Sequence, residues 1–256
     1  MTLRKRLRSD LAWSSAHRVV VRGHDLADLI GKVSLGDFAF LELKGRLPTP
    51  PESVVFNAIA ITLVEHGLTP SAIASRMTLL GAPESMQGAV AAGLLGLGSR
   101  FGGPVEDAAR MLQEALAEDP RDLAEAARRV VALHQEAKRP VPGLGHPVHR
   151  AVDPRVPRLF EVASENGLAG RHVDLMVAVG AEAARAYGRP LPVNATGAIG
   201  ALAGELGLPW QVCRGLAVMA RAIGLVAHVQ EELSEPLAAE IWERVEAEAS
   251  EHLRRD

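Results

Sequence analysis

Long stretches in which apolar residues recur every three or four positions dominate this sequence and favour a largely helical fold. Ala108, Met111, Leu112 and Ala115 form one such stripe, and the segment 123–131 repeats the same spacing. The composition agrees, because Ala, Leu, Glu and Arg lose little side-chain freedom in a helix and are abundant here, whereas aromatic residues make up only 4%. We therefore expect a mostly α-helical protein.

Two further segments, 53–64 and 86–97, are apolar nearly all round and rich in Ala or Gly. We expect both to lie wholly inside protein with close backbone approaches, and helices of this kind often pack across a subunit interface. More helices are expected towards the C-terminus, over 174–187, 198–206, 211–229 and 236–253. The longest uncharged stretches are shorter than a bilayer span, so no transmembrane helix is expected.

Length and charge limit the class of protein. A chain of 256 residues can form one large domain, or a large and a small one. The formal net charge of -3 provides no positive field for a polyphosphate backbone, so nucleic acid is not expected as a partner. The basic opening 3–8 lacks the apolar core of a secretory signal, and the single Cys213 cannot form an internal disulfide. A cytoplasmic location is therefore expected.

Two loops rich in Pro and Gly interrupt the helices, at 138–150 and 190–197. Rigid turns between helices often carry binding groups, which makes both loops candidates for a functional site. We expect the chain to divide near them. The predicted parts are residues 1–118, the N-terminal part of a large helical domain; 119–189, a smaller lobe with the first loop; and 190–256, the C-terminal part of the large domain.

Common catalytic signatures are absent, since the sequence holds no Gly-x-Gly-x-x-Gly, Walker or Gly-x-Ser-x-Gly pattern. His146, His149 and Asp153 could share a metal, because imidazole and carboxylate suit zinc. However, a His-Pro-Val-His turn is not the helical arrangement of hydrolytic zinc sites, so no metal is expected.

The first loop resembles that of a known family. Gly143-Leu144-Gly145-His146, followed by Arg150 and then by Asp153-Pro154-Arg155, is similar in type and spacing to the Gly-x-Gly-His loop of the citrate synthase and citryl-CoA lyase superfamily. Other segments resemble the same family: 31–48, Val64-Glu65-His66-Gly67, 98–103 leading into 108–112, and the Arg221-x-x-Gly224-x-x-x-His228 pattern. The resemblance covers nearly the whole chain from about Arg22.

This resemblance implies an all-α, multi-helical homodimer with a large and a small domain. It also implies a cleft that binds a coenzyme A thioester and a dicarboxylate keto acid such as oxaloacetate. The implied reaction makes or breaks the carbon–carbon bond of a citryl-CoA-like thioester. A chain this short looks like the compact, free-standing lyase type or the lyase module of ATP-citrate lyase.

The resemblance also assigns roles to individual residues. His146 would take the hydroxyl proton and then polarise the keto acid carbonyl, and His66 would hydrogen-bond the keto acid. Read as a structural residue, His66 could instead cap the preceding apolar helix. The implied substrate-binding residues are Arg150, Arg221, His149 and Asn194, and the implied coenzyme A-binding residues are Lys138, Arg139, Gly143 and Gly145. Arginine suits a carboxylate because its planar fork binds both oxygens, whereas Lys138 and Arg139 could equally be solvated side chains.

Three departures from the family bear on mechanism. The family's catalytic Asp corresponds to Thr196, a hydroxyl that does not ionise near neutral pH and is a poor general acid or base. Phe101 replaces a synthase histidine, and no Arg is present in 231–236, where the family often places a carboxylate-binding Arg. The carbon acid would then be served by water, Thr196 or His149. Two alternatives stay open: an enzyme that condenses or cleaves another acyl-CoA, and a non-catalytic acyl-CoA or dicarboxylate-binding protein.

Overall fold

The fold is almost entirely helical, as expected. A computed structural model describes residues 7–145 and 152–254. Its helices are α1 Leu26–Leu29, α2 Leu35–Lys44, α3 Pro50–Val64, α4 Pro70–Gly81, α5 Met86–Leu95, α6 Gly103–Ala117, α7 Leu123–Glu136, α8 Arg155–Glu165, α9 Arg171–Tyr187, α10 Ala195–Glu205, α11 Cys213–Ser234 and α12 Ala238–Ser250. Short helical turns lie at Gly98–Gly102, Trp210–Val212 and Glu251–Leu253. Every helix expected from periodicity is present within a few residues of its expected bounds.

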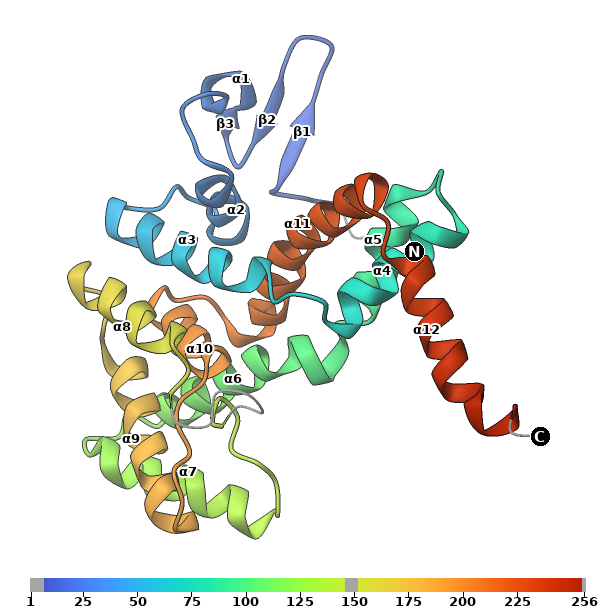
Figure 1. Cartoon of the computed structure of the whole chain (residues 1–256). Coiled ribbons are helices and arrows are strands. Elements are labelled where there is room, and N and C mark those ends of the chain that lie inside the picture. Colours follow the sequence, from blue (N-terminus) through green and yellow to red (C-terminus); the bar gives the residue numbers. More distant parts are fainter. Residues whose placement is uncertain (1–6, 146–151, 255–256) are drawn as a thin grey trace, which may run out of the picture.

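A small antiparallel sheet near the N-terminus was not expected from the helical composition. Its strands are β1 Ala12–Ser14, β2 Val19–Val21 and β3 His24–Asp25, in the order β1-β2-β3. A run of three valines favours a strand, and Arg22 and Gly23 both adopt positive φ in the tight turn between β2 and β3. The sheet stands apart from the helical body (Figure 1).

Helix α10 forms the centre of the body and packs against α3, α6, α8 and α9. Its residues from Gly197 to Gly204 are all buried. A Cβ on Gly200 would lie 2.8 Å from the backbone nitrogen of Ala109, so α10 and α6 approach more closely than side chains would allow. The main buried apolar cluster contains residues from all three predicted parts of the chain. The division into 1–118, 119–189 and 190–256 stays a prediction.

The expectation that segments 53–64 and 86–97 lie wholly inside the protein is wrong for a single chain. In α3, Ile61 is 73% exposed, and in α5, Leu95 is 84% exposed. The close backbone approach was correctly predicted, because a Cβ on Gly93 would lie 2.9 Å from the carbonyl oxygen of Ser71 in α4. Helix α5 therefore has one face packed on α4 and α11 and another apolar face open.

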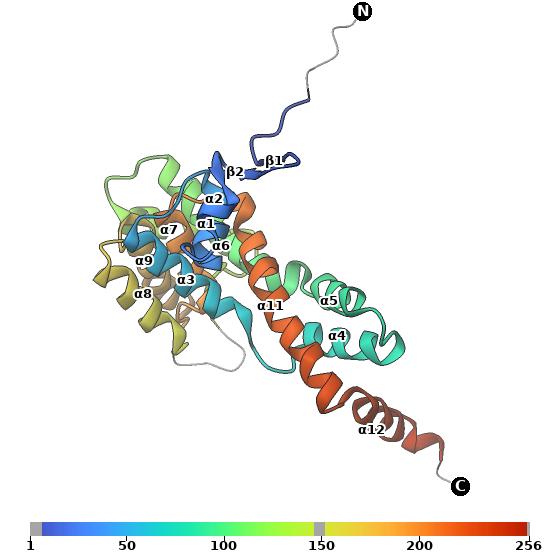
Figure 2. The same cartoon turned by 90° about the horizontal axis from the view of Figure 1, so that it is seen from above.

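Helix α11 crosses the middle of the molecule, and α12 extends away from its end (Figures 1 and 2). With the turn before it, α11 gives a 25-residue stretch, Trp210–Ser234, that is long and apolar enough to cross a membrane by length and composition. However, 44% of its most apolar window is buried inside the protein, and a core helix meets the same criteria. That no helix crosses a membrane stays a prediction.

Candidate active site

The two Pro- and Gly-rich loops lie side by side and pair with each other. The Gly145 backbone N–H donates to the Pro192 carbonyl at 2.8 Å, and the Asn194 backbone N–H donates to the Gly143 carbonyl at 2.9 Å. Leu144 and Val193 form an antiparallel bridge between these bonds. Both loops were predicted from their Pro and Gly content, and the fold joins them into one unit just before His146.

Two glycines allow the loops to approach this closely. A Cβ on Gly197 would lie 2.5 Å from the carbonyl oxygen of Gly143 and 2.9 Å from its Cα. Gly143 also has a φ of +80°, which favours glycine. Gly143 therefore holds the backbones together and does not line the pocket described below, whereas Gly145 does.

The end of the second loop differs from the expectation, because α10 begins at Ala195 and takes residues 195–197 into its first turn. Asn194 caps this helix: its Oδ1 accepts from the Gly197 backbone N–H at 3.1 Å and from the Thr196 hydroxyl at 2.7 Å. Its Nδ2 donates to the Gly145 carbonyl at 2.6 Å. Both polar atoms of the Asn194 amide are therefore engaged with the protein, and the Thr196 proton is already donated to its oxygen.

Asp153 links the start of α8 to α10. Its carboxylate is buried and accepts hydrogen bonds from the Ala195 backbone N–H at 3.0 Å and from the Arg155 side chain at 2.9 and 2.8 Å. Burial alone would raise the pKa of Asp153, but the hydrogen bonds from Arg155 and Ala195 outweigh it and lower the pKa to about 2. Asp153 thus ties the segment after the histidine loop to the N-terminus of α10.

This lowered pKa predicts how stability depends on pH. The Asp153 carboxylate stabilises the folded state above its unfolded pKa of about 4, and that contribution is lost as the pH falls towards 2. We therefore compare the free energy of unfolding of the native protein with that of Asp153→Asn. The difference between the two should be about 2 kcal/mol larger at pH 6 than at pH 2. Urea unfolding across this pH range measures the difference. A difference that stays constant with pH would contradict the prediction.

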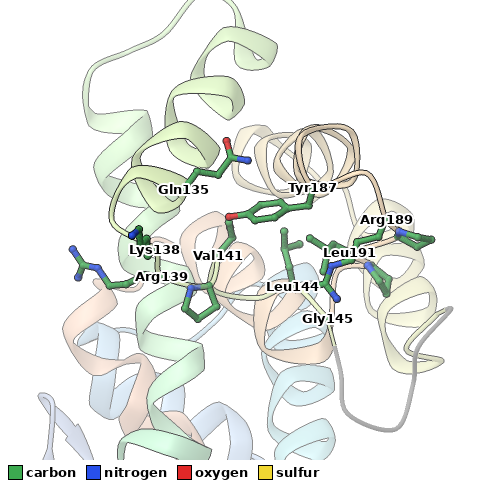
Figure 3. Close-up of a pocket in the computed structure, with 12 residues that line it drawn as sticks. Gln135, Lys138, Arg139, Val141, Leu144, Gly145, Tyr187, Arg189 and Leu191 are labelled. Carbon is green, nitrogen blue, oxygen red and sulfur yellow. The ribbon is translucent and has the colours of Figure 1, made fainter.

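A pocket of about 1190 Å³ opens beside the paired loops. Figure 3 shows Lys138 and Arg139 at one end and Arg189 at the other, with Tyr187 between them. Lys138 and Arg139 were predicted from the sequence, whereas Tyr187 and Arg189 were missed. The Tyr187-Gly188-Arg189-Pro190 turn was visible in the sequence, but only the fold brings it opposite the end of α7. The pocket offers three cations, an aromatic ring and apolar walls.

A second group of predicted residues lies where α3 ends against α11. Arg221, Gly224 and His228 lie three and four positions apart, so they share one face of α11. A Cβ on Gly224 would lie 2.2 Å from the Val64 carbonyl oxygen, and His228 Nε2 lies 3.1 Å from Glu65 Oε1. This face therefore packs on the segment that immediately precedes His66.

Arg221 is partly buried, and its Nε and Nη1 atoms have no hydrogen-bond partner among the described residues. Burial lowers the pKa of Arg221, and the nearby Glu65 carboxylate partly opposes this effect. A desolvated guanidinium with unused donors is suited to bind a carboxylate. His66, at the same junction, is exposed.

The predicted residues therefore fall into two groups in the structure. Asn194 and Thr196 lie at the paired loops, together with Gly143, Gly145 and the cationic pocket, and His66 and Arg221 lie at the junction of α3 and α11. Helix α3 packs against both α10 and α11. His146, His149 and Arg150 lie outside the described residues, so the convergence of all groups in one cleft stays a prediction.

Phe101, which replaces a synthase histidine in the resemblance, lies among the described residues. Phe101 lies in a π-helical turn, Gly98–Gly102, directly before α6, and it is partly exposed.

Within 7–145 and 152–254 no group of three His, Cys, Asp or Glu residues could hold a metal ion. Of the three residues considered for a metal, Asp153 is instead engaged by Arg155 and the α10 backbone. That the protein needs no metal stays a prediction.

Comparisons with known proteins agree with this arrangement. Citryl-CoA lyase from Hydrogenobacter thermophilus superposes with a TM-score of 0.83 and is 36% identical, over 90% of this chain and 88% of that chain. An ATP citrate lyase from Methanosaeta concilii, solved in complex with (3S)-citryl-CoA, shares the fold with a TM-score of 0.73 and 21% identity, over 91% of this chain and 40% of that chain.

Relatives identified by their sequences agree with these structural matches. ATP-citrate synthase beta chain protein 1 of Arabidopsis thaliana is 29% identical over 248 residues, or 89% of this chain. The chain spans about two-fifths of the length of such curated relatives, 38% in this case. The family described as "Citrate synthase, C-terminal domain" matches residues 43–242, which include both groups of site residues. The chain therefore belongs to the citrate synthase family.

Proposed function

We propose that this protein is a citryl-CoA lyase-like enzyme that cleaves or forms the carbon–carbon bond of a 3-hydroxy-3-carboxyacyl-CoA. Its products would be acetyl-CoA and oxaloacetate, or a related keto acid. The observation that carries the proposal is the cationic pocket beside Gly145, which opens next to paired loops that lead directly into His146. The similarity to citryl-CoA lyase over nine-tenths of the chain supports the same activity.

The pocket fits a coenzyme A thioester in its chemistry. Coenzyme A carries three phosphate groups, an adenine ring and a thin pantetheine arm. Lys138, Arg139 and Arg189 can neutralise phosphates, and Tyr187 offers a ring for adenine. The exposed positions of the three cations suit the solvated phosphates, and the thioester end would point along Gly145 towards the histidine loop.

The keto acid half fits the other group of residues. Arg221 has buried donors that have no partner among the described residues and could bind a carboxylate, and His66 lies at the same junction. In the cleavage direction His146 would accept the proton of the substrate hydroxyl. The carbon–carbon bond then breaks, and the former hydroxyl carbon becomes the oxaloacetate carbonyl. The electron pair of the broken carbon–carbon bond forms the acetyl-CoA enolate. Protonation of that enolate by water completes acetyl-CoA.

A citryl-CoA cleavage assay with Arg221→Ala tests this function. We expect the native protein to release oxaloacetate from citryl-CoA. The oxaloacetate is measured by its reduction with malate dehydrogenase, which consumes NADH. The variant should lose about 10²-fold or more in kcat/KM, because a buried charged contact is worth several kcal/mol. Arg244→Ala, at an exposed arginine on α12, is the matched control and should keep its activity. Equal activity of both variants would contradict the role of Arg221.

A non-catalytic binding protein is the second candidate. The sequence resemblance aligns Thr196 with the family's catalytic Asp, and the Thr196 hydroxyl, which donates its proton to Asn194 at 2.7 Å, is a poor acid or base. Tight binding of coenzyme A and oxaloacetate, measured by calorimetry, without any cleavage of citryl-CoA would favour this alternative over the enzyme.

We also propose that the protein acts as a homodimer. Helices α4, α5 and α11 pack on one another and expose large apolar side chains: Leu80, Met86, Leu95, Ile223 and Val226. A second copy packed on these helices would account for segments whose sequence is apolar nearly all round.

A further inference from the structure

We propose that His228 is a positioning residue: held by Arg76, it fixes the carboxylate of Glu65 and so orients the turn that presents His66 beside Arg221. This inference rests on the proposed function, in which His66 and Arg221 hold the keto acid. His228 is not expected to touch the substrate itself. A chain of hydrogen bonds runs from the buried Arg76 through His228 and Glu65 to the His66 backbone.

Arg76 is the buried start of this chain. Only 1% of Arg76 is exposed, although it lies in the middle of α4. Its Nη1 lies 2.8 Å from Glu232 Oε2, and its Nη2 also contacts Glu231. Glu232 in turn accepts from the backbone N–H groups of Leu237 and Ala238 at the start of α12. Arg76 is thus held rigidly, with its remaining donors directed at His228.

Arg76 decides how the His228 ring can hydrogen-bond. Arg76 Nε and Nη2 lie 3.3 and 3.0 Å from His228 Nδ1. A guanidinium can only donate, so Nδ1 must be the acceptor and the ring proton sits on Nε2. Nε2 lies 3.1 Å from Glu65 Oε1, where this proton is donated to the carboxylate. Arg76 therefore selects the ring form that can hold Glu65.

Glu65 carries the effect to the turn. Its Oε1 also accepts from the backbone N–H groups of His66 at 2.8 Å and Gly67 at 2.7 Å. The Glu65 side chain is 47% exposed and lines a cavity of about 750 Å³, so without His228 it could rotate towards water. His228 is the side chain that keeps this exposed carboxylate against the His66 turn.

The same carboxylate influences Arg221. Glu65 acts electrostatically on the Arg221 guanidinium, whose Nε and Nη1 have no partner among the residues described. A displaced Glu65 would therefore disturb both proposed keto acid contacts at once. The coenzyme A pocket is lined by other elements, the end of α7 and the loop before α10, and should not respond.

Two variants separate positioning from a general structural role. His228→Leu removes both ring nitrogens, whereas His228→Gln keeps an N–H donor where Nε2 lies. We expect His228→Leu to raise the Kd for oxaloacetate about tenfold or more and to leave the Kd for coenzyme A within about twofold. His228→Gln should restore most of the oxaloacetate affinity. His17→Leu, the same change at an exposed histidine of the N-terminal hairpin, is the matched control.

Hydrogen exchange provides a readout that does not depend on the proposed function. The His66 and Gly67 amides should exchange at least about tenfold faster in His228→Leu than in the native protein or His228→Gln. Unchanged exchange in a folded His228→Leu variant overturns the inference. So does an equal loss of affinity for oxaloacetate and coenzyme A. If the native protein binds neither ligand, the proposed function fails, and the exchange rates alone decide the role of His228.

Discussion

Replacing Gly197 with alanine should destabilise the protein by about 1–3 kcal/mol and remove most of its activity. The added Cβ would lie 2.5 Å from the Gly143 carbonyl oxygen and 2.9 Å from its Cα. Both contacts are with backbone, so no side-chain rotation relieves them, and the two loops must move apart. A displacement of about 1 Å at an active site can cost about 10²-fold in rate.

Gly215→Ala is the matched control for this experiment. Gly215 lies in α11, and a Cβ there meets nothing within 4 Å. The same chemical change should therefore stabilise the helix slightly, since alanine favours helix over glycine. Chemical denaturation gives the two free energies of unfolding, and citryl-CoA cleavage gives the rates. Similar behaviour of the two variants would show that the loops tolerate separation.

Periodicity predicted helices such as α6 and α7 because each of them buries one face, and burial of one face leaves apolar residues three and four positions apart in the sequence. It did not predict α4 or α8. The small sheet was missed because β2 has only three residues and its signal, Val19 to Val21 before an Arg-Gly turn, is weak beside the helical composition. Apolar segments such as 86–97 were predicted as helix correctly. Their open faces were not foreseen, because sequence alone does not show whether another chain covers them.

The site was predictable in its residue types and only partly in its contacts. The spacing of Arg221, Gly224 and His228 shows that they share a helix face, but nothing in the sequence tells that this face meets Glu65. Arg76 is the clearest case. An arginine in the middle of a helix is typical of a solvated surface, yet Arg76 is buried and paired with Glu232. The sequence does not show this pairing, because Glu232 is 156 residues away in the chain.

Introducing a carboxylate with Thr196→Asp should raise the rate of citryl-CoA cleavage by about 10²- to 10⁴-fold. The Thr196 hydroxyl now donates to Asn194 Oδ1 at 2.7 Å. A carboxylate cannot donate, and Asn194 cannot flip because its Nδ2 is bonded to the Gly145 carbonyl. The Asp side chain must therefore turn away from Asn194, while the N-terminus of α10 stabilises its charge. It would then be available to exchange a proton with the acetyl-CoA carbon.

Thr196→Asn is the matched control, because it has the size of Asp without an ionisable group. The rate of acetyl-CoA formation from citryl-CoA should rise with Asp and not with Asn, and both variants should bind coenzyme A as the native protein does. If Asp and Asn give the same rate, the proton at the acetyl carbon is not transferred at this position. The native protein would then use a different group for this proton transfer.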